Sequence, residues 1–166
     1  MTVPRASLQR ARLLLARGQG DEAGQLLEEV LEADPSHEEA LLMQAERKLE
    51  SRAEYEAIAL ARRAVALWPR SALARSGLAR CLHAVHDDDA ALAEAQEGRR
   101  LLEEGDNARH AAPVYLTLVW CLREKRLLRE ALATAEAGLA RVGDAVLAHW
   151  AGTVEEELAA AEQEEC

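Results

Sequence analysis

The feature of this chain that most restricts its fold is a sequence period of 34 residues. Ala23 and Ala57, which each follow a glutamate, lie 34 residues apart, and so do Pro35 and Pro69. A shared interval of this length is a property of the architecture and not of a catalytic site, so the sequence predicts a chain of structural repeats. The alanine recurs further along the chain, and its four positions are Ala23, Ala57, Ala91 and Ala131.

Each of these alanines opens an expected helix in which small or apolar residues recur four and seven positions later. This spacing lies on one helical stripe, where small residues let a second helix approach closely. Twelve residues upstream of each alanine lies another small residue, so the chain is expected to repeat helix, turn and helix four times. The stripe positions are Leu27, Val30, Ala61, Ala64, Ala95, Gly98, Ala135 and Gly138, and the upstream positions are Ala11, Ala45, Ala79 and Val119.

Turn signals separate the expected helices. Gly18 and Gly20 interrupt the first hairpin, and residues 86–90, "HDDDA", cap the start of a helix in the third. The two prolines of the period stop helices, because proline cannot continue one. The polar stretch 103–112 is suited to a loop between the third and fourth hairpins.

A last helix is expected over 144–166, with Asp144 as its N-cap. Its apolar stripe would run through Val146, Trp150, Val154 and Leu158, and its other face is acidic. The run "EEE" at 155–157 is interpreted as part of that solvated face. Repeat arrays need a terminal helix of this kind to cover the last apolar edge.

The 34-residue period, Gly-x-x-x-Glu-Ala, the small residues at fixed offsets and the closing proline resemble the tetratricopeptide repeat family. The resemblance is best in "GQGDEAGQLLEEVLEADP" and "YEAIALARRAVALWP", although Ser7, Leu41 and Arg75 stand where tryptophan is common. It implies an all-α, right-handed superhelical solenoid of about four helix-turn-helix repeats with a C-terminal capping helix. The expected parts are a repeat domain over 1–143, with units of about 4–37, 38–71, 72–105 and 112–143, and a capping helix with an acidic tail over 144–166.

Charge and cysteine content limit the partners and the compartment. The net charge is −10 and the pI about 5.0, which argues against a nucleic-acid partner and against acidic membrane surfaces. No run of eighteen apolar residues indicates a membrane span. Three widely spaced cysteines favour a reducing compartment, so we expect a cytoplasmic protein. The first twenty residues have the composition of a transit peptide, but they fall in phase with the repeat and are interpreted as structural.

The resemblance also implies that a peptide or helix of a partner protein binds in a concave groove lined by the first helix of each repeat. The matching positions give an apolar floor with three arginines, and Trp and Arg are enriched at binding hot spots. The alternative is that the leucines belong to the core and that Trp120 packs against the last helix. The expected groove residues are Leu8, Arg12, Leu42, Met43, Glu46, Leu73, Arg80, Leu116, Trp120 and Arg123.

The sequence therefore favours a non-catalytic interaction module, an adaptor or assembly chaperone. One alternative is a dedicated bacterial secretion-system chaperone for one client. Another is a self-associating structural subunit, a homo-oligomer with Trp68 or Trp150 exposed. The acidic last helix could also occupy the groove and block it.

No catalytic, cofactor or metal site is expected. His83, His86 and the run 87–89 could hold a metal, but no cysteine or third preorganised ligand accompanies them, and an N-capping turn explains them better. The chain has no GxSxG, HExxH or phosphate-binding glycine loop. Two cysteines share a repeat position that suits a buried packing role, and the third adjoins an acidic tail that disfavours its thiolate; they are Cys81, Cys121 and Cys166.

Overall fold

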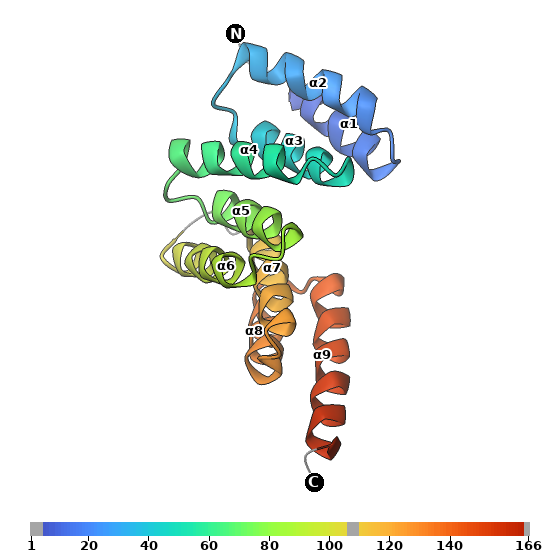
Figure 1. The fold of residues 1–166 in the computed structure, drawn as a ribbon, viewed down its shortest axis with the longest axis vertical. Coiled ribbons are helices and arrows are strands. Elements are labelled where there is room, and N and C mark those ends of the chain that lie inside the picture. The colour runs from blue at the N-terminus through green and yellow to red at the C-terminus, as the bar shows by residue number, and fades with distance from the viewer. Residues whose placement is uncertain (1–4, 106–109, 165–166) are drawn as a thin grey trace. The chain divides into compact units, whose positions relative to one another are not determined.

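The computed structural model describes residues 5–105 and 110–164, which form helices joined by short turns (Figure 1). Part of the loop expected over 103–112, and Cys166, lie outside the described residues. The helices are α1 (Arg5–Ala16), α2 (Gly20–Ala33), α3 (Glu38–Glu50), α4 (Glu54–Leu67), α5 (Ala72–Ala84), α6 (Asp88–Glu103), α7 (Ala111–Glu124), α8 (Leu128–Val142) and α9 (Ala145–Glu164).

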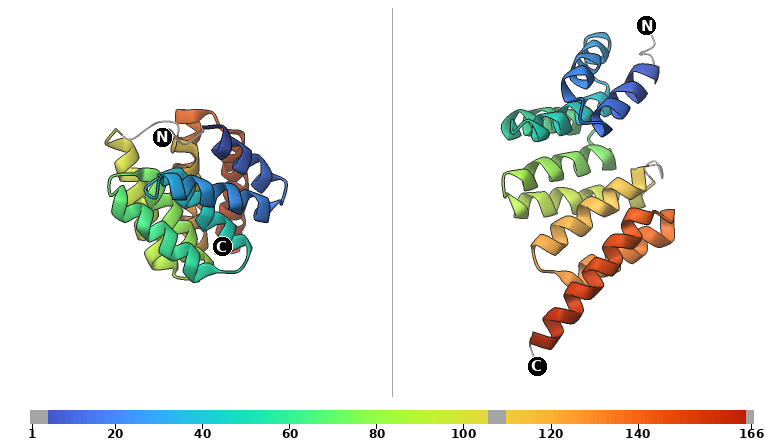
Figure 2. Two further views of the ribbon diagram at one scale, coloured as in Figure 1. Left: turned by 90° about the horizontal axis from the view of Figure 1, so that it is seen from above. Right: turned by 90° about the vertical axis from the view of Figure 1, so that its right-hand side faces the viewer.

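The expected all-α fold of four helical hairpins and a C-terminal helix is confirmed. Within the hairpins α1 packs on α2, α3 on α4, α5 on α6 and α7 on α8. The chain forms two compact units, one up to Pro69 with α1–α4 and one from Arg70 with α5–α9. In the second unit α9 lies along α8 and also contacts α7 (Figure 2). The expected domain boundary between residues 143 and 144 stays a prediction.

The stripe of small residues predicted from the period is buried in all four hairpins. Each opening alanine, each residue four and seven positions later, and each residue twelve positions upstream is buried. The helices approach closely at Gly138 of α8, where an added Cβ atom would lie 2.8 Å from Cβ and from Cγ of the buried Tyr115 in α7. Side-chain size at these positions therefore sets how closely the paired helices pack.

The turn inside each hairpin has the same backbone structure. One residue has a positive φ angle, and its amide donates to the carbonyl three residues back. The next amide donates to the carbonyl five residues back, which is the hydrogen-bond pattern of a Schellman motif. The residues with positive φ are Gly18, Arg52, His86 and Arg126, so only the first hairpin shows a glycine signal in the sequence.

The helix ends agree with the capping predictions. α2 and α4 end at Ala33 and Leu67, shortly before the two prolines. The side chain of Asp87 accepts a hydrogen bond from Ala90 N at 3.3 Å at the start of α6. The Asp144 carboxylate accepts from the backbone amides at the start of α9, at 2.9 and 3.1 Å, which confirms it as the N-cap.

The predicted apolar stripe of α9 is wrong at its first position. Val146 is 50% exposed, whereas Leu147 is fully buried against Tyr115 and its neighbours. Steps of four residues rotate by about 400°, so a stripe built only from such steps drifts around the helix. The buried side of α9 begins at Leu147 and continues through Val154.

Candidate partner-binding surface

The three apolar groove residues predicted in the first unit are buried. Leu8 and Met43 pack in a core cluster with Leu27 of α2, and Leu42 is also buried. These side chains therefore fill the interior and do not form a solvent-facing floor. The apolar pattern of a first helix does not separate these roles, because positions facing the core and positions facing solvent are adjacent around the helix.

The polar groove residues of the first unit lie nearer the surface. Arg12 is exposed and forms an ion pair with Glu39 of α3. Glu46 is half-buried in α3. The first unit thus offers charged side chains at the predicted positions but no exposed apolar residue among them.

In the second unit the predicted residues lie on α5 and α7, which pack against each other. The Ser76 hydroxyl of α5 donates to Thr117 Oγ1 of α7 at 2.8 Å, and Thr117 Oγ1 donates to the Pro113 carbonyl at 2.8 Å. This buried hydrogen-bond chain fixes the two helices side by side. Leu73 and Arg80 of α5 and Leu116 of α7 are half-buried on these helices.

Trp120 is the exposed aromatic residue of this surface. Its side chain is 39% exposed, and its ring meets that of Trp150 in α9 edge to face, with the ring centroids 6.1 Å apart. A tryptophan held in a fixed position by a second ring and still open to solvent presents a large apolar area with little loss of entropy on binding.

Arg123 connects the same pair of helices. Its guanidinium carbon lies 5.3 Å from the centre of the Trp150 ring, within range of a cation–π interaction. Its Nε and Nη2 atoms donate to the Glu157 carboxylate at 2.9 and 2.6 Å. These hydrogen bonds raise the pKa of Arg123 and lower the pKa of Glu157, more than burial opposes either change.

Trp150 and Glu157 are therefore part of this surface, which we call the α5–α7–α9 surface. Its members are Leu73, Arg80, Leu116, Trp120, Arg123, Trp150 and Glu157. The prediction that the whole run 155–157 is solvated is wrong for Glu157, which is half-buried and bound to Arg123. The sequence signal for it was the placement of an acidic residue seven positions after Trp150, on the same side of α9.

The His/Asp cluster and the cysteines have structural surroundings. His83 Nδ1 lies 3.0 Å from Asp88 Oδ1, and no group of three or more His, Cys, Asp or Glu side chains in the described residues is arranged to hold a metal ion. Cys81 and Cys121 are buried, in agreement with a packing role. Burial, with a smaller effect from the Asp88 charge, raises the pKa of the Cys121 thiol to about 12.

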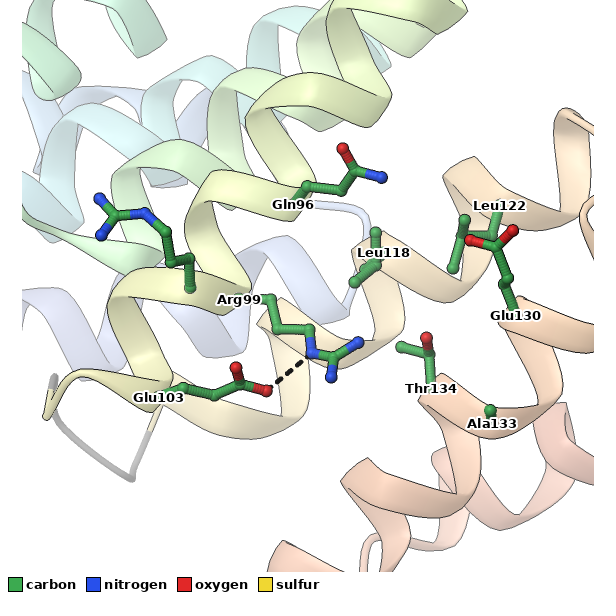
Figure 3. A pocket seen from close by; sticks show the side chains of 9 residues that line it. Gln96, Arg99, Glu103, Leu118, Leu122, Glu130, Ala133 and Thr134 are labelled. Carbon is green, nitrogen blue, oxygen red and sulfur yellow. Dashed lines mark hydrogen bonds and ion pairs between the residues drawn. The ribbon is translucent and has the colours of Figure 1, made fainter.

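A separate hollow of about 350 Å³ lies among α6, α7 and α8 (Figure 3). Leu118 and Leu122 line it, and Arg99 at its edge donates to Glu103 at 2.8 Å. None of the predicted groove residues lines this hollow. Both of its arginines, Arg99 and Arg100, are already paired with glutamates, and its polar groups do not converge on one point, so it lacks the features of a small-molecule site.

Comparison with known proteins matches one part of the chain to a repeat family. Residues 4–47 match the family model described as tetratricopeptide repeat. A comparison with curated protein sequences finds no match. Among the described residues, no helix has the length and apolar character needed to cross a membrane.

Solved structures share the fold at low sequence identity. TTC0263, a thermophilic TPR protein of Thermus thermophilus, is 21% identical with a TM-score of 0.79, over 93% of this chain and 82% of that chain. PilF of Pseudomonas aeruginosa is 20% identical with a TM-score of 0.73, over 97% of this chain and 72% of that chain. YrrB, a TPR protein with an unusual peptide-binding site, is 20% identical with a TM-score of 0.55, over 91% and 75%. Residues 4–47 thus match a tetratricopeptide repeat, and the chain as a whole shares the fold of solved TPR proteins.

Proposed function

We propose that this chain is a non-catalytic protein–protein interaction module, an adaptor or assembly chaperone. The α5–α7–α9 surface would bind an apolar or amphipathic peptide or helix of a partner protein. The observation that carries the proposal is the 39% exposed side chain of Trp120, which is flanked by the half-buried Leu116 and by Arg123. Tryptophan and arginine are the residue types that most often dominate binding energy at protein interfaces.

Binding would use the rigidity of the helices. Apolar side chains of the guest would contact Leu73, Leu116 and Trp120, and because the helices are preformed, the receptor loses little entropy. The likeness to YrrB, a protein with a peptide-binding site, supports a peptide guest.

α9 contributes Trp150 and Glu157 to this surface. Because Glu157 already occupies Arg123, an acidic group of the guest competes with it for the guanidinium. Removing α9 is a poor test of this competition, since Leu147 belongs to the core of the second unit. A Glu157→Gln substitution removes the charge and leaves α9 in place.

The acidic composition and the buried thiols support the remaining parts of the proposal. A net charge of −10 opposes binding to nucleic acid phosphates. Buried thiols at Cys81 and Cys121 suit a reducing compartment, and we place the protein in the cytoplasm.

The proposal is tested by affinity capture from the native extract, identification of the partner segment, and titration calorimetry with that segment as a synthetic peptide. Trp120→Ala should weaken binding at least tenfold, as expected for a hot-spot residue. Tyr55→Ala is the matched control, because Tyr55 is 81% exposed in the first unit and lies outside the surface. Unchanged affinity in a Trp120→Ala variant with native circular dichroism would move the binding site elsewhere.

A further inference from the structure

The first and last described helices carry opposite charge. Residues 1–20 contain four arginines and no acidic residue, although the whole chain has a net charge of −10. α9 contains five glutamates and no lysine or arginine. Both helices have exposed faces outside the α5–α7–α9 surface, and nothing proposed above uses these faces.

The exposed side of α1 carries a leucine that lies between two arginines along the chain. Leu13 is 60% exposed, on the side of the helix opposite the buried Ala11. Arg10 lies three residues before it and Arg17, the first residue after the helix, four residues after it, and both are exposed. Neither arginine forms an ion pair with another described residue. An exposed leucine with unneutralised arginines on both sides is suited to an apolar contact framed by acidic groups.

The complementary arrangement lies on α9. Glu155 and Glu162 are exposed, and the exposed Ala159 lies between them, four residues after the first and three before the second. Alanine leaves room for a larger side chain from an opposing helix. Glu162 accepts a hydrogen bond from Arg129 at 2.8 Å, but both side chains are more than half exposed, so this pair is weak and can be exchanged.

The two faces match in register. Arg10 and Arg17 are seven residues apart, as are Glu155 and Glu162, and seven helical residues span about 10.5 Å. When the two segments run antiparallel, Arg17 meets Glu155, Leu13 meets Ala159 and Arg10 meets Glu162. Charge and size therefore agree at all three positions.

We propose that α1 of one molecule docks antiparallel on α9 of a second copy of this chain. Both halves of the interface are present in one polypeptide, which identifies a second copy as the partner. The contact joins two different surfaces. In a pair, one molecule therefore keeps a free α9 face and the other a free α1 face, and further copies can bind to them. One helix on one helix is a small interface, so the association is weak and transient.

Sedimentation velocity over a range of protein concentrations tests the proposal on the full chain. The mean mass should rise with concentration at about 50 mM NaCl and fall towards that of the monomer at about 500 mM NaCl, because salt screens exposed ion pairs. Leu13→Ser should raise the dissociation constant at least tenfold. A monomer at all concentrations in low salt, or association that Leu13→Ser leaves intact, would overturn the proposal.

Charge reversal separates this interface from other forms of association. Arg10→Glu/Arg17→Glu makes both docking faces acidic, and Glu155→Arg/Glu162→Arg makes both docking faces basic, so each variant alone should be monomeric. An equimolar mixture should associate again, because each acidic docking face then meets a basic one. Failure of the mixture to associate, or association of either variant alone, contradicts the proposal.

Two control variants carry the same charge changes elsewhere. Arg52→Glu/Arg62→Glu and Glu28→Arg/Glu32→Arg alter exposed residues on neither face and should associate as the unsubstituted chain does. If these controls also become monomeric, net charge and not the α1–α9 contact governs association, and the proposal fails. Loss of self-association with peptide binding retained would leave the proposed function standing, since Trp120 is not altered in any of these variants.

Discussion

Replacing Gly138 with alanine tests whether the predicted stripe of small residues controls helix packing. A Cβ atom at this position would lie 2.8 Å from both Cβ and Cγ of Tyr115 and 3.1 Å from Cδ1 of Leu147. Tyr115 is buried and the contacted atoms are at the root of its side chain, so a rotamer change cannot relieve the clash. α7 and α8 would have to separate. Overpacking of this kind costs about 1–3 kcal/mol of the free energy of unfolding.

Gly152 of α9 provides the matched control. A Cβ atom there meets nothing within 4 Å. Alanine is favoured over glycine in a helix interior by about 0.8–1.0 kcal/mol, so Gly152→Ala should stabilise the protein by about that amount. Gly138→Ala receives the same gain, and the difference between the two variants isolates the packing cost.

We expect Gly138→Ala to be less stable than Gly152→Ala by about 1–3 kcal/mol, measured by urea unfolding followed by circular dichroism. For a chain of this length the melting temperatures should differ by roughly 2–12 °C. If the two variants have equal stability within about 0.5 kcal/mol, the α7–α8 interface tolerates a larger residue and the proposed reason for the glycine is wrong.

Three further predictions concern named side chains. Arg123 lowers the pKa of Glu157 in the folded state. The ion pair therefore stabilises the protein at pH values above 4.5, the ordinary pKa of a glutamate, and that stability is lost as the pH falls through the lower folded pKa. The melting temperature of Glu157→Gln should therefore lie below that of the unsubstituted chain at about pH 7 and approach it near pH 3; a gap that persists at the acidic end would refute the ion pair as the cause. Ser76→Ala removes a buried hydrogen bond to Thr117 and should cost about 0.5–1.5 kcal/mol in urea unfolding, whereas no cost would show that the two helices do not depend on it. Cys121, with its pKa raised to about 12, should resist maleimide at about pH 8 in the folded chain and react in urea, as read by peptide mass spectrometry; rapid labelling of the native protein would contradict its burial.

The repeat positions could be predicted because they follow from size and period alone. A residue such as Ala61 or Gly98 has no role that competes with close packing, so the 34-residue interval places it correctly. Helix ends at prolines and at Asp144 were predictable for a similar reason, since each depends on the residue itself and its near neighbours.

The partner of Arg123 could not be predicted in this way. It bonds to Glu157, 34 residues further along the chain, and this choice depends on how α9 lies across α7 and α8. The same limit applies to Leu8 and Met43, where the sequence shows apolar character but not which side of the first helix is covered. A stripe that drifts by about 40° for each step of four residues explains the error at Val146.

The hairpin turns have a consequence for how much stability this fold can still gain. An L-residue with a side chain loses about 1–2 kcal/mol on adopting the left-handed conformation, and Arg52, His86 and Arg126 all do so. Glycine would relieve most of that strain. Its greater conformational freedom in the unfolded chain would, however, lower the free energy of unfolding by about 0.5–1 kcal/mol. The free energy of unfolding of this chain can therefore still be raised by substitutions in these three turns. A thermostable version could be engineered there without altering any helix surface.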